Sequence, residues 1–404
     1  MKRIVLLFLA IAFVAVTGFA QEIKFSGYVN SGVGVEFSSR DGEEDPMIRV
    51  FGVDSEQRGG RFRLNGSYVN EGKTIGVDLR FQLQGVNTVN NSADVGLVFG
   101  YGWIKPVDML LIKAGLVGDT TFETQGPILR DDAGGGAGAG LFVKLTPIDG
   151  FDIGVGVYPL SADGSNNNHR IQAIATNQKW YDVKYTFGLA YTMPEVFKIN
   201  TSFRTSNDAG VASRSQARGI AEFQLLMVED MTAILELEIE RIFNKADEFD
   251  MFKDTGKINI FETFAYKIND LRFGLNAAQY ISKDDNFDDI GLRFNPWVSY
   301  AFAEGKIVPR LDGVFFMGGD RWRTGHPGTY STGDPSDIEK FDRRMDVAPT
   351  YNWDEYVISA RPSVKINIDS RNFLEIGNAF YYRKQANVDG FINNVFYIDL
   401  VTRF

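Results

Sequence analysis

Apolar and polar residues alternate one by one along a stretch in the first quarter of the chain. Between Thr74 and Gln84 every second side chain is apolar, and the positions between them hold glycine, hydroxyl, amide or charged residues. Successive side chains point to opposite faces only when the backbone is extended, so this period of two predicts a β-strand with one apolar and one polar face. The preceding segment repeats the pattern, with Phe62 and Leu64 on its apolar face.

Tight turns join such segments in pairs along the rest of the chain. We predict these turns at 70–73, 105–107, 148–150, 193–195, 228–230, 269–270, 303–305 and 369–371. Longer polar connections separate the pairs, at 38–59, 119–140, 161–179, 244–255 and 318–354. Short periplasmic turns and long outer loops are typical of an all-β fold, the transmembrane antiparallel β-barrel. The segments predict about 18 strands, within a range of about 16 to 20.

The start of the chain has the features of a secretory signal. Lys2 and Arg3 precede an apolar run at 4–16, and small residues lead to Ala20. This order predicts a signal peptide, residues 1–20, that is cleaved after Ala20 and leaves one β-barrel domain, residues 21–404. Beyond this segment no run approaches the roughly 18 apolar residues that a membrane-spanning helix requires, so a membrane-embedded chain must cross with strands.

Composition narrows the class of protein further. The net charge is −10, which argues against nucleic acid as a partner, because nucleic-acid binding rests on clustered Lys and Arg. The chain has no cysteine, which excludes disulfides and thiolate metal sites. It contains 33 Phe and 16 Tyr although its mean hydropathy is −0.15. This combination suits a membrane barrel, in which only alternate residues meet lipid and aromatic residues gather at the interfaces.

The last strand ends at the terminal residue of the sequence with an aromatic side chain. Phe396, Ile398, Leu400 and Phe404 share one face of this segment. The pattern resembles the β-signal that barrel-assembly machinery recognises in outer-membrane proteins. Together with the signal peptide and the strand pattern, it makes the chain similar to the Gram-negative porins as a broad class, although it matches no subfamily motif. The resemblance implies an outer-membrane location, contact with outer-membrane lipid and the assembly machinery, and a possible homotrimer.

In porins of this layout the third long loop folds inward and narrows the channel. Here that loop is 119–140, and its charged residues are Glu123, Arg130, Asp131 and Asp132, followed by a glycine-rich run. Glycines permit close contact with a wall, and carboxylates at a narrow point favour cations, so we expect a constriction. A surface loop that stays outside the channel is the alternative.

Charged residues on the polar faces of the predicted strands fall in two groups. The basic group lies on the second and third strands, and the acidic group lies on the tenth and eleventh. The members are Arg61, Arg63, Arg80, Glu222, Glu236, Glu238 and Glu240. If these side chains face the lumen, the two groups create a transverse field that orients polar solutes. The alternative is that any inward residue is polar because it meets water.

These features predict a porin: a water-filled channel for passive diffusion of small polar solutes and ions, without cofactor or metal. A substrate-selective channel remains an alternative, with Tyr181, Tyr185 and Tyr191 on one strand face, and so does an adhesin or receptor that binds through 318–354. A barrel-embedded hydrolase is disfavoured. The sequence contains only two histidines, and both fall in predicted outer loops.

The hypothesis of a transverse field makes a prediction for ion selectivity. Reversing Arg63→Glu and Arg80→Glu together removes two positive charges from the basic group and adds two negative ones. We expect the reversal potential in a salt gradient to shift toward cation preference. Unchanged selectivity in single-channel recordings contradicts the hypothesis.

Overall fold

The structure is a computed structural model of the 404-residue chain. It describes residues 22–39, 46–51, 62–87, 92–119, 121–122, 124, 139–158, 184–205, 218–240, 257–282, 289–318, 356–385 and 388–404. The predicted signal peptide, residues 1–20, lies outside these residues. No helix in the described part is long and apolar enough to cross a membrane.

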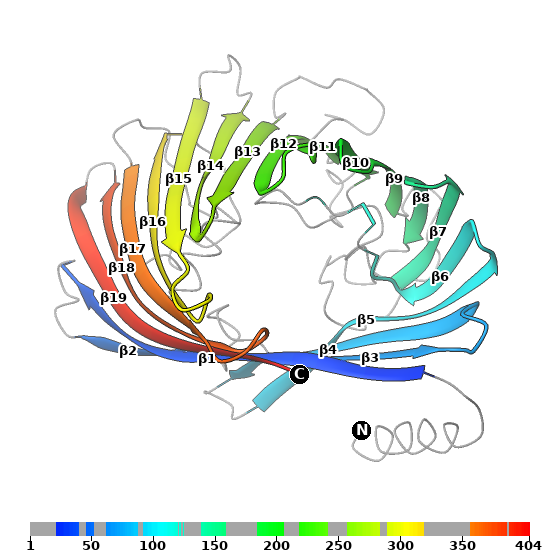
Figure 1. Ribbon diagram of the computed structural model, residues 1–404, viewed down its shortest axis with the longest axis horizontal. Helices are drawn as coiled ribbons and strands as arrows, with labels where there is room; N and C mark the ends of the chain where they lie inside the picture. The colour runs from blue at the N-terminus through cyan, green and yellow to red at the C-terminus, as the bar shows by residue number, and fades with distance from the viewer. Residues whose placement is uncertain are drawn as a thin grey trace.

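One antiparallel sheet contains every strand of the described part, in chain order around a ring (Figure 1). The strands are β1 (Glu22–Ser38), β2 (Met47–Phe51), β3 (Phe62–Val69), β4 (Ile75–Asn87), β5 (Ser92–Val107), β6 (Leu110–Leu116), β7 (Ala139–Ile148), β8 (Phe151–Tyr158), β9 (Lys184–Met193), β10 (Phe197–Arg204), β11 (Arg218–Leu225), β12 (Met231–Glu240), β13 (Lys257–Ile268), β14 (Leu271–Ser282), β15 (Asp289–Tyr300), β16 (Ile307–Gly318), β17 (Tyr356–Asn367), β18 (Phe373–Gln385) and β19 (Val388–Arg403).

The first and last strands pair and close the ring. Their register runs from Tyr28 opposite Arg403 to Ser38 opposite Asn393. Closure matters because a barrel has no open sheet edge, so every strand finds backbone partners on both sides. The fold is therefore a closed antiparallel barrel.

Strand β2 departs from the predicted arrangement. The sequence pattern assigned 38–59 to an outer loop, and this was wrong for Met47–Phe51, which pairs with β1 at Gly32–Glu36. β3 pairs with the other part of the same edge of β1, from Glu22 to Val29. β2 and β3 thus share one place beside β1, so the 19 strands occupy 18 places in the ring. The predicted number of strands is confirmed.

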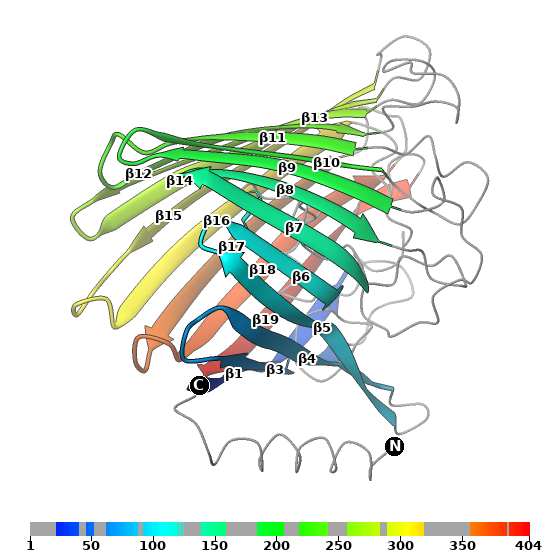
Figure 2. The same ribbon diagram turned by 90° about the vertical axis from the view of Figure 1, so that its right-hand side faces the viewer.

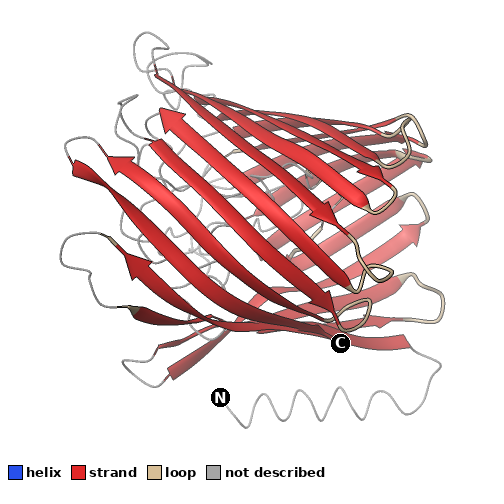
Figure 3. Cartoon of the chain, turned by 60° about the vertical axis from the view of Figure 1, so that its left-hand side comes forward, coloured by secondary structure: helices blue, strands red, loops and turns tan. Residues whose placement is uncertain are grey.

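The tight turns gather at one end of the barrel, as coloured hairpins in Figure 2 and tan segments in Figure 3. They fall at the predicted sites with one exception. The turn predicted at 105–107 lies instead at Asp108–Met109, because β5 continues through Pro106 to Val107. The register shifts between Ile104 and Val107, and proline is tolerated in a strand at such an irregularity because no regular ladder bond is lost.

The two faces of the strands differ as their alternation predicts. On β12 the apolar Leu235 and Leu237 are 49% and 39% exposed, whereas Glu236 and Glu238 between them are 0% exposed. The same contrast of exposed apolar and covered polar side chains recurs around the sheet. A closed ring turns one face inward, so the apolar face is the outer wall and the polar face is the inner wall.

The carboxy-terminal residue is held at the seam between β1 and β19. Gly27 N donates to Phe404 O at 2.9 Å, and Phe404 N donates to Gly27 O at 3.0 Å. The Phe404 ring lies over Gly27, where an added Cβ would approach within 2.6 Å of the ring and 2.3 Å of the Arg63 carbonyl oxygen. Gly27 is therefore required for this close packing. Phe396, Ile398 and Leu400 lie on the same outer face of β19 as Phe404.

We predict that Gly27→Ala destabilises the folded barrel by about 1–3 kcal/mol, because the new methyl group overlaps the backbone of β3 and the Phe404 ring. The loss is measurable as a lower temperature of the heat-induced mobility shift in gel electrophoresis. Gly102→Ala is the matched control, since a Cβ there meets no atom closer than 3.9 Å. Equal shifts for the two variants would refute the packing argument.

Candidate functional site

The chain turns into the barrel directly after β6. Val117 is 2% exposed and Phe122 is 0% exposed, and both pack with Tyr101, Phe142 and Tyr158 in an apolar cluster on the inner wall. The rings of Phe122 and Phe142 meet edge to face, with centroids 6.1 Å apart. The described beginning of the third loop thus lies against the inner wall of β5 to β8.

Glycines on β8 make room for this loop. The inner-wall positions of β8 are Gly154 and Gly156, and the next is Tyr158. A Cβ on Gly154 would lie 2.3 Å from the Phe122 ring and 2.9 Å from the Phe142 ring. The wall is therefore recessed where Phe122 docks, because glycine has no side chain to fill that space.

A buried ion pair fastens the same loop. Lys113 Nζ on β6 lies 2.7 Å from an Asp119 carboxylate oxygen, and the two side chains are only 10% and 4% exposed. Lys113 also donates to the Gly118 carbonyl oxygen at 3.1 Å. On the other side, Thr121 N donates to Asp119 at 2.8 Å, and Lys144 Nζ donates to the Thr121 hydroxyl at 2.8 Å. Two lysines of adjacent strands thus hold one turn of the loop.

The carboxyl group of Asp119 is ionised in this setting. Burial acts to raise its pKa, but the charges of Lys113 and Lys144 and the hydrogen bonds from Lys113 and Thr121 together outweigh burial and leave the pKa below its ordinary value. A carboxyl whose pKa is depressed by folding stabilises the structure above its unfolded pKa. That stability is lost as the pH falls through the folded pKa. The Lys113–Asp119 ion pair is therefore fully formed at neutral and mildly acidic pH.

The predicted basic residues lie on adjacent strands of the inner wall. The Arg63 guanidinium carbon on β3 lies 5.5 Å from the centroid of the Tyr28 ring. Arg80 on β4 donates from Nε to Asn65 at 2.7 Å, and its guanidinium carbon lies 4.5 Å from the Phe99 ring centroid. Aromatic faces attract such cations, so both guanidinium groups have fixed positions.

The predicted acidic residues lie on β11 and β12, about half a turn of the ring away from β3 and β4 (Figure 1). Glu222 and Glu236 stand directly opposite each other in the register, and they are 2% and 0% exposed. Glu238 accepts a hydrogen bond from Asn259 of β13 at 2.8 Å.

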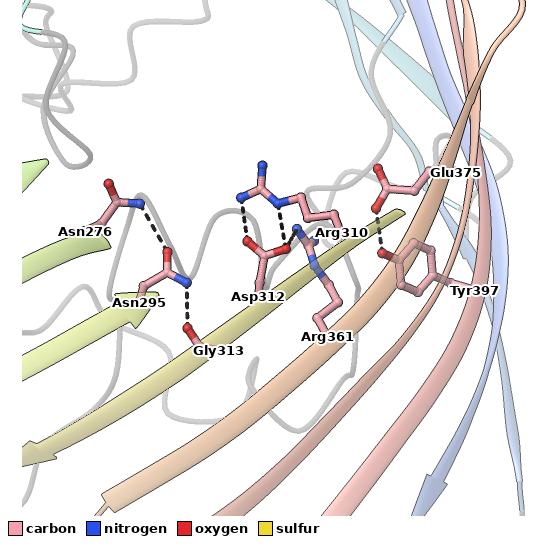
Figure 4. A network of polar contacts seen from close by, with 8 residues as sticks. All are labelled: Asn276, Asn295, Arg310, Asp312, Gly313, Arg361, Glu375 and Tyr397. Atoms are coloured by element: carbon pink, nitrogen blue, oxygen red, sulfur yellow. Dashed lines mark hydrogen bonds and ion pairs between the residues drawn. The ribbon is translucent and has the colours of Figure 1, made fainter. Parts of the chain in front are cut away.

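A third charged group, on β15 to β17, was not singled out from the sequence. Asp312 is bound by Arg310 Nε at 2.8 Å and by Arg310 Nη2 at 2.5 Å, and Arg361 Nη2 lies 3.5 Å from it (Figure 4). Asp312 and Arg361 are 1% and 3% exposed, and Arg293 on β15 is 2% exposed. The spacing of Arg310 and Asp312 two residues apart was the available sequence signal, because it places both on one face of a strand.

Amide and phenol groups extend this polar lining along neighbouring strands. Asn276 donates to Asn295 at 3.2 Å, Asn295 donates to the Gly313 carbonyl oxygen at 2.7 Å, and the Tyr397 hydroxyl donates to Glu375 at 2.7 Å (Figure 4). Each bond joins two different strands. The inner wall therefore carries side-chain hydrogen bonds that link β14 to β16 and β18 to β19.

Several predicted residues cannot be placed. Glu123, Arg130, Asp131, Asp132 and Arg61 lie outside the described residues, as do both histidines. Glu240 ends β12, and its side chain is not described. Within the described residues, no group of three or more acidic or histidine side chains could hold a metal ion.

No protein-family model matches this sequence, and no curated protein matches it. Solved structures do share its fold at low sequence identity. OccAB4 of Acinetobacter baumannii is 10% identical, with a TM-score of 0.53 over 95% of this chain and 98% of that chain. The outer membrane protein opdK of Pseudomonas aeruginosa is 12% identical, with a TM-score of 0.50 over 94% of this chain and 99% of that chain. OpdK of Pseudomonas aeruginosa, in its structure with vanillate, is 12% identical, with a TM-score of 0.53 over 94% of this chain and 99% of that chain. The chain thus has the fold of porin-like outer-membrane barrels.

We predict that Lys113→Met releases the loop from the inner wall, because it leaves the buried Asp119 carboxylate without its main counter-charge. Breaking such a pair on one side costs about 3–5 kcal/mol. The measurable result is a larger or noisier single-channel conductance at neutral pH. In the unsubstituted protein the same change appears only as the pH falls below the usual range of a carboxyl group. Lys105→Met, at an exposed site near the turns, is the control, and an identical effect there would contradict the role of the ion pair.

Proposed function

We propose that this chain is an outer-membrane porin that forms a water-filled channel for passive diffusion of small polar solutes and ions. The observation that carries the proposal is the contrast between the two walls. The outer wall is apolar and suits lipid, whereas the inner wall carries charged and amide side chains from β3 round to β19. A polar inner wall in a closed membrane barrel is stable only in contact with water or polar loops.

The size of the ring supports a pore. Barrels of about 16 to 18 strands are wide enough to leave an aqueous channel unless a plug fills it. The described start of the third loop covers the inner wall at β5 to β8. We therefore propose that the loop at 119–140 narrows the channel from that side, opposite the inner wall of β14 to β19.

Charge on the inner wall supports a preference among ions. Basic side chains on β3 and β4 face acidic side chains on β11 and β12 across the ring, which suits a transverse field. The Arg-rich group on β15 to β17 adds positive charge beside the acidic group. A solute with separated charges would align between these sectors as it passes.

A substrate-selective channel is the second candidate, and one contact favours it. The Trp297 ring on the inner wall of β15 lies 4.6 Å from the guanidinium carbon of Arg310 and 5.5 Å from that of Arg272. An aromatic face beside two guanidinium groups can stack on a planar ring and bind a carboxylate. OpdK has been crystallised with vanillate, an aromatic carboxylate.

Export and assembly follow from the same proposal. We propose that the signal peptide is removed after Ala20 and that the outward-facing Phe396, Ile398, Leu400 and Phe404 of β19 serve as the assembly signal. The pairing of β19 with β1 supports this role, since it is the pairing that closes the ring.

Planar-bilayer conductance of the refolded mature protein tests the two candidates together. A porin gives large, stable, ohmic openings that vanillate at millimolar concentration leaves unchanged. A selective channel gives small openings that vanillate blocks, and Trp297→Ala removes the block. A folded barrel that never conducts would contradict both.

A further inference from the structure

A row of hydrogen-bond donors crosses the inner wall near the turn end of the barrel. The pairing of β13 to β17 brings five inward side chains into one line across the strands, each directly opposite the next. They are Lys267, Arg272, Ser299, Arg310 and Ser363, and we call them the donor row. Three members are cations and two are hydroxyls, so every position offers a donor and none holds a carboxylate.

The cations of the donor row are open to the lumen. The side chains of Lys267 and Arg310 are 55% and 38% exposed, and Arg272 is also exposed. Arg293 and Arg361, which lie farther from the turns on the same wall, are only 2% and 3% exposed. A solute in the channel can therefore reach all three cations of the donor row.

One aromatic ring positions two of these cations. The Trp297 ring lies against β14, because Gly274 directly opposite has no side chain, and an added Cβ there would lie 2.6 Å from the ring. The guanidinium carbons of Arg272 and Arg310 lie 5.5 Å and 4.6 Å from the centroid of this ring. The two groups are therefore no more than about 10 Å apart, the sum of these distances. Cation–π attraction holds them in place before a ligand arrives, which lowers the entropy cost of binding.

The carboxylates that contact the donor row leave it with an excess of positive charge. Asp312 binds Arg310 through Nε and Nη2 and also lies 3.5 Å from Arg361, so one carboxylate serves two guanidinium groups (Figure 4). Asp230 lies 4.0 Å from the lysine of the row, and an ion pair as exposed as this one contributes little. Arg272 forms no ion pair within the part of the chain that the structure describes. Four cations thus meet two carboxylates, which leaves two positive charges.

We propose that the donor row binds small oxyanions with two negative charges, such as phosphate or a short dicarboxylate, at the turn end of the channel. One exposed ion pair contributes little, so a monoanion that contacts one cation is held weakly. A dianion can contact Arg272 and Arg310 together, and Ser299 between them supplies a further donor. The inference deepens the proposed function and rests on it only in taking the inner wall as the wall of a water-filled channel.

Ligand-observed NMR on the refolded mature protein in detergent, at low salt and mildly alkaline pH, tests the proposal. Broadening of the phosphorus signal of phosphate and of the proton signal of succinate gives two dissociation constants, and acetate is the monoanion for comparison. We expect both dianions to bind about tenfold more tightly than acetate. Arg272→Gln should weaken both about tenfold, because it removes the cation that has no carboxylate partner in the described part. Arg272→Lys keeps the charge and should weaken them less.

Lys198→Gln is the matched control. Lys198 is the second residue of β10, as Arg272 is the second residue of β14, and it lies on the inner wall outside the donor row. Its loss removes one positive charge from the same end of the barrel and should leave the affinity for both dianions unchanged. The heat-induced mobility shift in gel electrophoresis confirms that each variant is folded.

Other results overturn the proposal. The starting protein may not leave the signals of phosphate and succinate unbroadened, since that result excludes the site. Equal weakening by Arg272→Gln and Lys198→Gln shows that the overall charge of this end attracts anions, and equal affinity for succinate and acetate excludes contact with two cations. A barrel that binds phosphate but never conducts contradicts the proposed function alone. A conducting barrel that binds neither dianion contradicts this inference alone.

Discussion

The backbone pairing between β1 and β19 is the interaction on which the rest of the structure depends. In hydrocarbon an unpaired N–H or carbonyl group costs several kcal/mol, because no water is present to bond it. A sheet with two open edges would carry a row of such groups along each edge. Closure removes both rows at once, and the Gly27–Phe404 hydrogen bonds continue the pairing to the last residue of the sequence. The close packing of Phe404 on Gly27 stabilises the end of the seam.

Closure also separates two chemical environments that a flat sheet would leave alike. Apolar residues such as Leu235 remain exposed on the outer wall, where lipid solvates them, and polar residues such as Glu236 are covered on the inner wall. The start of the third loop then packs against the inner wall. The glycines of β8 leave a recess for Phe122, and the Lys113–Asp119 pair lies beside that cluster with little exposure. Because this ion pair is shielded from water, either charge would be costly to bury without the other, so the two side chains must stay in contact.

The carboxyl group of Glu262 on the outer wall departs from this separation of polar and apolar side chains. A polar side chain on the inner wall requires no special account, since water or polar loops meet it. Glu262 is different because its surroundings are apolar and one of its oxygens has no donor.

The sequence by itself determined which residues face outward, where the turns lie and how many places the ring has. These properties depend on the local backbone, because an extended chain fixes the direction of each side chain relative to its neighbours. Local patterns failed where they were interrupted, at the strand β2 and at Pro106. Only the tertiary structure decided which side chains meet: Phe122 with Gly154, and Arg361 with Asp312, which lies 49 residues earlier. Such partners belong to different strands or to a loop, and their distances follow from register and closure of the whole ring, which no single segment specifies.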